Sequence, residues 1–131
     1  MAEQRCDLYA GPEVRMARSG LESIAERQVL HLTTIGRVSG LPREIEIWFV
    51  VHRARIYLFS EHREAAGWVR NIRHNPQVSV RFGRRRLAGV ARVLERRTDR
   101  KLWEEVAAIA ERKYGWGGGL PVEIEPLARR P

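Results

Sequence analysis

The residues best suited to chemistry lie in the stretch LTTIGRVSGLPRE, residues 32–44. Arg37, Ser39 and Arg43 surround one tight turn between two short apolar segments. Guanidinium groups bind phosphate and carboxylate through paired hydrogen bonds, and a hydroxyl adds a further donor. The turn is therefore a candidate for holding an anionic cofactor, while a solvated surface loop or a nucleic-acid contact would use the same residue types.

Two further polar clusters follow along the chain. The first comprises Ser60, His62 and Arg63 in the loop after the third expected strand, and the second comprises Trp68, Arg70 and Asn71 in a short helical segment. In an antiparallel meander the turn between the first two strands lies near the end of the third. We therefore expect the three clusters to converge near a helix N-terminus, which favours anions. Each residue type is also common at strand ends, in solvated loops or in cores without any site.

Several common catalytic motifs are absent from the sequence. It contains no phosphate-binding loop, and the glycines at 115–119 follow a predicted helix rather than a strand. The four histidines lack the paired spacing of a metal site, so no metal is expected. There is no serine elbow, and Cys6 has no obvious partner base. An enzyme with this sequence would depend on a bound organic cofactor.

The composition is strongly basic, with a formal net charge of +8 over 131 residues. Almost all of the positive charge is Arg, which favours an anionic partner, although a genome rich in Arg codons would give the same excess. No apolar run approaches the ~18 residues of a membrane span. A single cysteine favours a reducing cytoplasm. We expect an N-terminal arm at 1–18 and one domain at 19–131.

The apolar pattern predicts mainly β-structure. Strands are expected at 29–35, 43–51, 56–60, 78–82, 87–93 and 122–124. In the second, Ile45, Ile47, Phe49 and Val51 share one face, and Glu44, Glu46, Trp48 and Val50 share the other. Strands joined by short turns favour an antiparallel barrel.

Three helices are expected beside these strands. A capping box at 19–22 predicts a helix at 20–28. A short helix at 68–73 ends before Asn75-Pro76, because the residue before proline avoids the helical region. Thr98 is expected to cap a helix that runs to about residue 113 and is stopped by Gly115.

Three segments resemble the split-barrel flavin and deazaflavin reductases, a superfamily related to pyridoxamine 5'-phosphate oxidase. They are LTTIGRVSGLPREIEI, IYLFSEHREAAGWVRNIRHNPQVSVRF and LAGVARVLE. The runs T-x-G-R-x-S-G-x-P-R and W-x-x-N-I-x-x-N-P-x-V are most similar to the deazaflavin-dependent nitroreductase group. The resemblance covers about residues 29–125 and implies a mainly β (α+β) fold. That fold is a split antiparallel β-barrel of about six strands with two or three short flanking helices, usually a homodimer.

The resemblance also implies a cofactor and a role for each candidate residue. The cofactor would be coenzyme F420, with FMN as the alternative, and a hydride would pass from it to a quinone, nitroaromatic or enone. Arg37, Ser39 and Arg43 would meet the phosphate and carboxylates of the cofactor tail, Ser60, His62 and Arg63 would lie near its ring or linker, and Trp68, Arg70 and Asn71 would shape the groove. Trp48, Tyr114 and Trp116 would line the substrate pocket, where Tyr114 or solvent would protonate the product.

Two other functions remain open. Four arginines surround a hairpin turn, namely Arg81, Arg84, Arg85 and Arg86. Small barrels often bind single-stranded nucleic acid, so this hairpin is a candidate contact. Aromatic residues are not interleaved with these arginines, which favours a solvated hairpin and makes a nucleic-acid partner the weaker hypothesis. A barrel that holds the cofactor without turnover would have the same sequence features.

Overall fold

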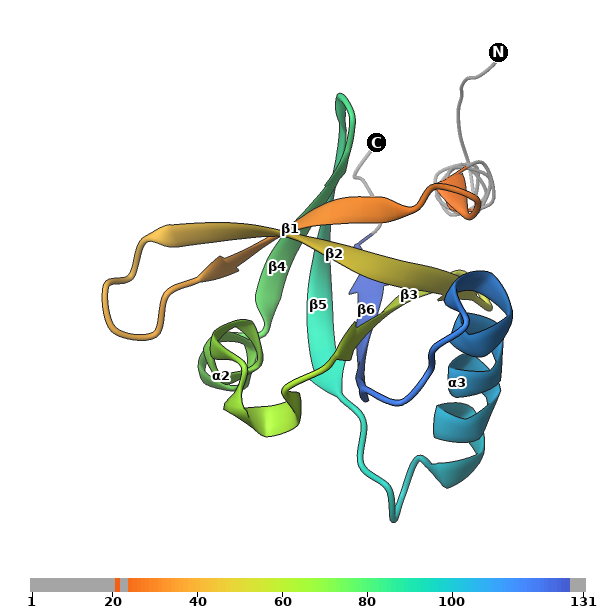
Figure 1. The fold of residues 1–131 in the computed structure, drawn as a ribbon. Helices are drawn as coiled ribbons and strands as arrows, with labels where there is room; N and C mark the ends of the chain where they lie inside the picture. Colours follow the sequence, from red (N-terminus) through yellow and green to blue (C-terminus); the bar gives the residue numbers. More distant parts are fainter. Residues whose placement is uncertain (1–20, 22–23, 128–131) are drawn as a thin grey trace.

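The computed structural model describes Leu21 and residues 24–127 (Figure 1). The expected arm at 1–18 lies outside the described residues, as does the capping box at 19–22 apart from Leu21. Leu21 and Ile24 are helical and buried in the hydrophobic core. No helix in the described part of the chain is both long and apolar enough to cross a bilayer.

Six antiparallel strands of the described residues close into a barrel. They are β1 (Val29–Ile35), β2 (Pro42–His52), β3 (Arg55–Ser60), β4 (Gln77–Phe82), β5 (Arg85–Val93) and β6 (Leu120–Pro126). Their order around the barrel is β1-β2-β3-β6-β5-β4, and β4 pairs back onto β1. Each of these strands is therefore paired on both sides. The prediction of a mainly β barrel with about six strands is confirmed.

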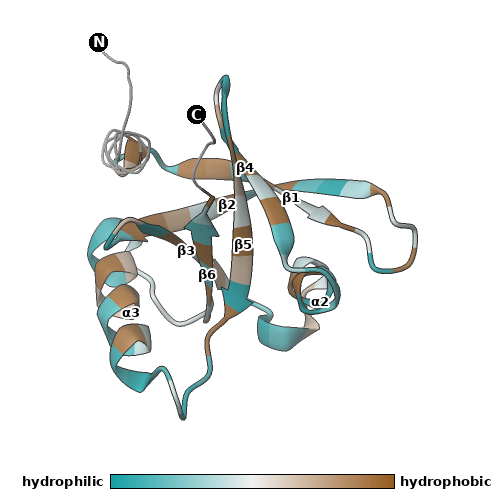
Figure 2. Ribbon diagram, turned by 180° about the vertical axis from the view of Figure 1, so that it is seen from behind, coloured by the Kyte–Doolittle hydropathy of each residue, from teal (hydrophilic) through white to brown (hydrophobic). Residues whose placement is uncertain are grey.

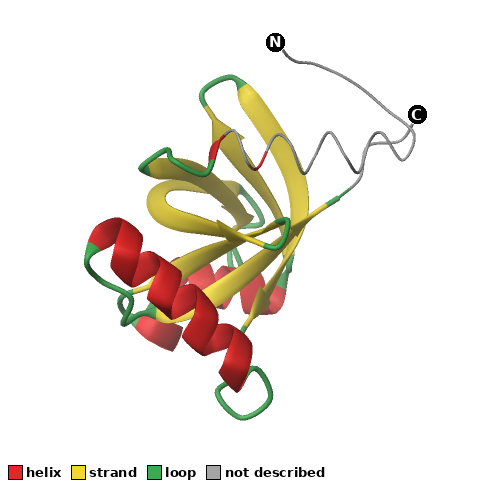
Figure 3. Ribbon diagram, turned by 90° about the vertical axis from the view of Figure 1, so that its right-hand side faces the viewer, coloured by secondary structure: helices red, strands yellow, loops and turns green. Residues whose placement is uncertain are grey.

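The alternation expected along β2 holds only in its first half. Glu44 and Glu46 are exposed and Phe49 is fully buried, as predicted, but Val50 on the outer face is also buried. The reason is α3 (Arg100–Tyr114), which packs across the outside of β2 and β6 (Figure 3). The outer face of β2 is therefore exposed to solvent at Glu44 and Glu46 and buried in a second apolar layer at Val50.

The helix α3 presents Trp103, Val106 and Ala110 to this layer, and hydrophobic and hydrophilic residues alternate along it in Figure 2. It ends at Gly115, which has the left-handed φ of 75°. The prediction that Thr98 caps its start is wrong, because the N-cap is Asp99.

The side chain of Asp99 contacts residues that precede the helix in the chain. Its carboxylate accepts a hydrogen bond from the backbone N–H of Glu95 at 2.8 Å and two from the guanidinium of Arg92 at 3.0 and 3.1 Å. Burial alone would raise the pKa of Asp99, but these donors outweigh it and lower the pKa. The Asp99 side chain makes no hydrogen bond to the helix itself, and its contacts with Glu95 and with Arg92 of β5 fix the residue that precedes the first turn.

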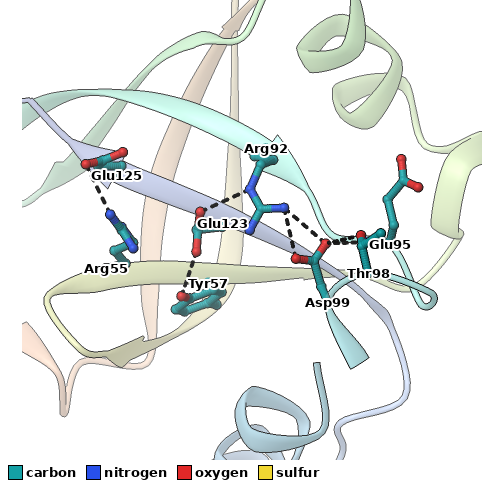
Figure 4. A network of polar contacts seen from close by, with 8 residues as sticks. All are labelled: Arg55, Tyr57, Arg92, Glu95, Thr98, Asp99, Glu123 and Glu125. Carbon is teal, nitrogen blue, oxygen red and sulfur yellow. Dashed lines mark hydrogen bonds and ion pairs between the residues drawn. The ribbon is translucent and has the colours of Figure 1, made fainter. Parts of the chain in front are cut away.

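The same arginine belongs to a polar network between the barrel and α3 (Figure 4). The buried carboxylate of Glu123 accepts hydrogen bonds from the Tyr57 hydroxyl at 2.8 Å and from Arg92 Nε at 3.3 Å. Burial raises the pKa of Tyr57, and the bond to Glu123 raises it further. A buried carboxylate is costly unless it is paired, so these contacts hold β3, β5 and β6 in one arrangement.

The connection between β3 and β4 contains the 3-10 turn η1 (Arg63–Ala65) and the helix α2 (Gly67–His74). The helix extends one residue beyond the predicted range at each end, and η1 occupies what was expected to be a plain loop. In Figure 1 the β1–β2 hairpin projects from the barrel on the same side as α2. This places the turn at 36–41 against the amino end of α2.

Candidate functional site

A cleft of about 470 Å³ opens between the β1–β2 turn and the amino end of α2. It is lined by Thr34, Gly36, Arg37, Val38, Ser39, Arg43, Ile45, Gly67, Trp68 and Asn71. The structure thus brings the arginine-rich turn together with Trp68 and Asn71 of the predicted helical cluster, but not with Arg70. Two guanidiniums and a helix N-terminus in one cleft form a suitable site for phosphate or carboxylate groups.

Arg37 is held in this cleft by Asn71 of α2. Its Nη1 donates to Asn71 Oδ1 at 2.8 Å and lies 3.4 Å from the carbonyl oxygen of Gly67, and its backbone N–H donates to the same Oδ1 at 3.2 Å. Asn71 Nδ2 in turn donates to Thr34 Oγ1 at 3.1 Å. Arg37 itself is exposed, so an anion can reach the held guanidinium from solvent.

Ser39 shapes the other side of the turn. Its Oγ accepts hydrogen bonds from the backbone N–H of Leu41 at 3.1 Å and from Arg43 Nη2 at 3.5 Å. A Cβ at Gly36 would lie 2.7 Å from the same Oγ and 3.3 Å from the carbonyl oxygen of Leu41, so a larger residue would require the Ser39 side chain to move. Both contacts use the oxygen as an acceptor, and the hydroxyl hydrogen can point to an anion.

The amino end of α2 faces the cleft without a competing group. No side chain caps it at Ala66, and its first turn contains no acidic residue. A Cβ at Gly67 would meet no heavy atom within 4 Å, so the space beside this end is open. The partial positive charge of the helix terminus therefore adds to that of the two arginines.

The cluster after β3 lies elsewhere. Ser60 is buried, and its Oγ donates to the carbonyl oxygen of Arg63 at 2.9 Å. Arg63 has a left-handed φ of 54°, and its Nη2 donates to the carbonyl oxygen of Gly118 at 2.9 Å. His62 and Arg70 are exposed and do not line the cleft. This loop contacts the glycine-rich segment at 115–119, and none of its residues lines the cleft beside the β1–β2 turn.

The three aromatic residues expected in a substrate pocket do form a cluster. The rings of Trp48 and Tyr114 are stacked, with centroids 4.3 Å apart and 7° between planes, and Trp116 meets Trp48 edge-on at 6.3 Å. Trp48 remains 40% exposed. The cluster lies where α3 ends against β2, outside the lining of the anion-binding cleft.

The hydroxyl of Tyr114 is occupied by backbone groups. It lies 2.7 Å from the carbonyl oxygen of Gln28 and 2.8 Å from that of Phe49, and it accepts the Phe49 N–H at 3.1 Å. Burial raises the pKa of this hydroxyl, and the backbone contact only partly opposes the shift. The phenol is therefore a weaker acid than a tyrosine in water.

Lys113 was not among the predicted site residues, although it lies on the apolar stripe of α3. Its Nζ donates to the carbonyl oxygens of Phe49 at 2.9 Å and Ala25 at 3.0 Å, and it lies 4.1 Å from the centroid of the Phe49 ring. Burial lowers the pKa of Lys113 to about 8. A lysine at an apolar position of an amphipathic pattern is the signal that would have indicated this contact.

The basic hairpin between β4 and β5 has internal partners. Arg81 Nη2 lies 3.4 Å from a carboxylate oxygen of Glu44, and Arg86 Nη1 donates to Ser79 Oγ at 3.3 Å. The tip of the hairpin is hydrophilic in Figure 2.

Within the described residues, no group of three His, Cys, Asp or Glu side chains is arranged to hold a metal ion.

Solved structures share this fold. An F420-H2 dependent reductase, FDR-A, is 27% identical over 75% of this chain and 93% of its own, with a TM-score of 0.57. The heme storage protein HutZ from Vibrio cholerae is 21% identical over 93% of each chain, with a TM-score of 0.65. A third structure, described as a domain-swapped dimer, is 25% identical over 85% of this chain and 97% of its own, with a TM-score of 0.58. No curated protein matches the chain in sequence.

A sequence model of the F420H(2)-dependent quinone reductase family matches residues 10–125. The match includes the cleft, the aromatic cluster and all of the six strands except the last residue of β6, and it confirms the predicted relationship to the deazaflavin-dependent split-barrel reductases. The chain belongs to the F420H(2)-dependent quinone reductase family and is an oxidoreductase whose cofactor is coenzyme F420.

Proposed function

We propose that this protein reduces a small quinone, with the anionic tail of F420 held in the cleft between the β1–β2 turn and α2. The observation that carries the proposal is the convergence of Arg37 and Arg43 on the uncapped amino end of α2. The cofactor tail bears a phosphodiester and several glutamates, so its charge complements this cleft. The family description favours a quinone, and nitroaromatics and enones are alternative electrophiles for the same transfer.

In this proposal some lining residues bind the charged groups of the cofactor and others form the wall of the cleft. Arg37, Ser39 and Arg43 bind the phosphate and carboxylates, while Trp68 forms an apolar wall. Asn71 supports the turn from α2. The residues outside the lining have lesser roles: Ser60 shapes the loop after β3, and the exposed side chains of His62, Arg63 and Arg70 would contact the cofactor only from the rim.

The chemistry requires little acid–base work from the protein. Bound reduced F420 supplies the hydride, and a quinone then needs one further proton to become a hydroquinone. Because the Tyr114 hydroxyl is bonded to backbone groups and its pKa is raised, we propose that solvent supplies this proton. Trp48, Tyr114 and Trp116 would provide the apolar surface that receives the substrate ring.

We further propose that the protein is a cytoplasmic homodimer. The domain-swapped dimer among the similar structures supports a dimer, as does the partly exposed Trp48 on the outer face of β2. The single cysteine of the sequence supports a reducing compartment.

A titration of the purified protein with oxidised F420, in parallel with FMN, tests the proposed cleft. We expect tighter binding of F420, weakened by salt because the contacts are between charges. Arg37→Ala and Arg43→Ala should each cost about 1.5–3 kcal/mol of binding free energy. Arg84→Ala, which removes one exposed charge from the basic hairpin, is the matched control and should have little effect. Unchanged affinity in both cleft variants would remove the cleft from the site.

A further inference from the structure

Asn71 lines the cleft, but its contacts give it a different role from that of a cofactor ligand. We propose that Asn71 is a positioning residue that makes the cleft selective for the anionic tail of the cofactor, by fixing Arg37. This inference rests on the proposed function, in which Arg37 binds that tail.

The amide oxygen of Asn71 is fully used by the protein, and one of the two hydrogens on its nitrogen is also bonded. Its oxygen accepts two hydrogen bonds from Arg37, one from the backbone N–H at 3.2 Å and one from Nη1 at 2.8 Å. Its nitrogen donates to Thr34 Oγ1 at 3.1 Å. An amide oxygen has two lone pairs, so both are occupied. The side chain is also almost fully buried, so we expect Asn71 to act on an anion mainly through Arg37 and not through its second N–H.

The orientation of this amide is set before any ligand arrives. Asn71 is 6% exposed and Thr34 is 1% exposed, so solvent does not compete for either end. Thr34 lies on β1 and Asn71 on α2, and Arg37 lies in the turn that follows β1. The three residues thus connect the rigid barrel to the helix and then to the exposed turn.

Two contacts from one oxygen hold both the main chain and the guanidinium of Arg37. An exposed arginine without such a partner samples many rotamers, and ordering it on binding reduces the affinity. With Asn71 in place that ordering is already done, and Nη1 is drawn toward the carbonyl oxygen of Gly67 at the amino end of α2. The guanidinium is therefore held where the helix terminus also favours an anion.

The choice of an amide over a carboxylate has a clear electrostatic reason. Aspartate at this position would also accept hydrogen bonds from Arg37, with the Thr34 hydroxyl turned to donate to it, but its charge would cancel that of the guanidinium. The ionisable residues of the cleft lining are Arg37 and Arg43, and the first turn of α2 contains no acid. A neutral acceptor positions the arginine and leaves the positive potential of the cleft intact.

Titration with two ligands distinguishes a positioning role of Asn71 from a general contribution of Asn71 to the stability of the fold. One is oxidised F420, and the other is its deazaflavin core without the phosphodiester tail, and fluorescence titration gives the dissociation constant of each. Asn71→Leu should weaken F420 binding about tenfold, the equivalent of one charge-assisted contact, and leave binding of the tail-free core nearly unchanged. Equal weakening of both ligands would overturn the proposal.

The variant Asn71→Asp tests the electrostatic part of the proposal. It retains an acceptor for Arg37, and the Thr34 hydroxyl can turn to donate to the carboxylate in place of the lost N–H, so exchange protection of the Arg37 amide should persist. F420 binding should nevertheless weaken and lose part of its salt dependence, because one net charge has left the cleft. Asn71→Asp with the affinity and salt dependence of the wild type would contradict the electrostatic part of the proposal.

A double-mutant cycle identifies the route of the effect. In an Arg37→Ala background, Asn71→Leu should cause little further loss of F420 affinity, since residues that act as one unit are not additive. Full additivity would show that Asn71 does not act through Arg37. Unchanged F420 affinity in Arg37→Ala alone would instead overturn the proposed function. If Asn71→Leu fails to fold, Thr34→Val removes the outer partner, and Thr34→Ser, which keeps the hydroxyl, is its control.

Discussion

The ring of Trp48 on β2 stacks on that of Tyr114 at the end of α3, with centroids 4.3 Å apart. The hydroxyl of the same tyrosine is bonded to Gln28, just before β1, and to Phe49 on β2. One side chain therefore supplies an aromatic surface to the proposed substrate site and joins three segments of the fold. Its two roles can be separated by removing only the oxygen.

Tyr114→Phe keeps the stacked ring and removes the hydroxyl. We expect the free energy of unfolding to fall by about 1–2 kcal/mol, because the Phe49 N–H loses an acceptor and the single hydroxyl donor that the Gln28 and Phe49 carbonyl oxygens share is removed. The kcat for quinone reduction should change little, since solvent supplies the proton. Denaturant unfolding and steady-state kinetics check both points. A large loss of kcat at unchanged stability would identify Tyr114 as the proton donor.

Lys113 should make stability depend on pH in the alkaline range. Burial lowers its pKa from 10.5 to about 8, so between about pH 8 and 10 the unfolded chain binds more protons than the folded one. The free energy of unfolding contributed by this group therefore rises with pH in that window. Above pH 10 the raised pKa of Tyr114 reverses the trend, because the unfolded chain loses the phenol proton first.

Urea unfolding at several pH values between 7 and 10 measures this slope. Lys113→Met should flatten it, because the titrating amine is gone. Lys101→Met, at an exposed position of the same helix, is the matched control and should leave the slope unchanged. An unaltered slope in Lys113→Met would contradict the assignment.

In the glycine-rich segment at 115–119, alanine should be tolerated at position 118 but not at position 117. A Cβ at Gly117 would overlap the carbonyl oxygen of Ala107 on α3, whereas a Cβ at Gly118 would lie 3.5 Å from Trp116 Nε1, an ordinary contact. Gly117→Ala should cost about 1–3 kcal/mol of stability as the segment moves away from α3. Gly118→Ala should be close to neutral. Thermal unfolding of the pair makes the comparison, and equal losses would show that the close approach is unimportant.

Two substitutions on β3 should differ according to the burial of their partners. Tyr57→Phe removes a donor from the buried Glu123 and should cost about 1–3 kcal/mol of stability. Arg55→Met removes an exposed ion pair with Glu125 and should cost less than about 1 kcal/mol. Chemical denaturation of both variants tests the difference. A larger effect for Arg55→Met would contradict the greater importance of the buried Glu123 contacts within the network of Figure 4.

Much of the fold was predictable because its signals are local. Alternating apolar residues placed β1, β4 and β5, and Asn75-Pro76 ended α2 as expected. The errors arose where distant groups intervened: Asp99, which is bonded to Arg92 of β5, precedes α3 in place of Thr98, and α3 packs against β2, where Val50 of the outer face is buried. A pattern within one segment does not report which other segment will cover it.

The sequence by itself determined the barrel, the arginine-rich turn and the resemblance to deazaflavin reductases, because these depend on residue types at short spacings. Only the tertiary structure decided which polar residues share a cleft. Asn71 meets Arg37 across 34 residues of chain and Thr34 across 37, whereas Ser60 and Arg63 turn toward Gly118. Such pairings follow from barrel closure and from the left-handed backbone at Arg63, and no local pattern encodes either.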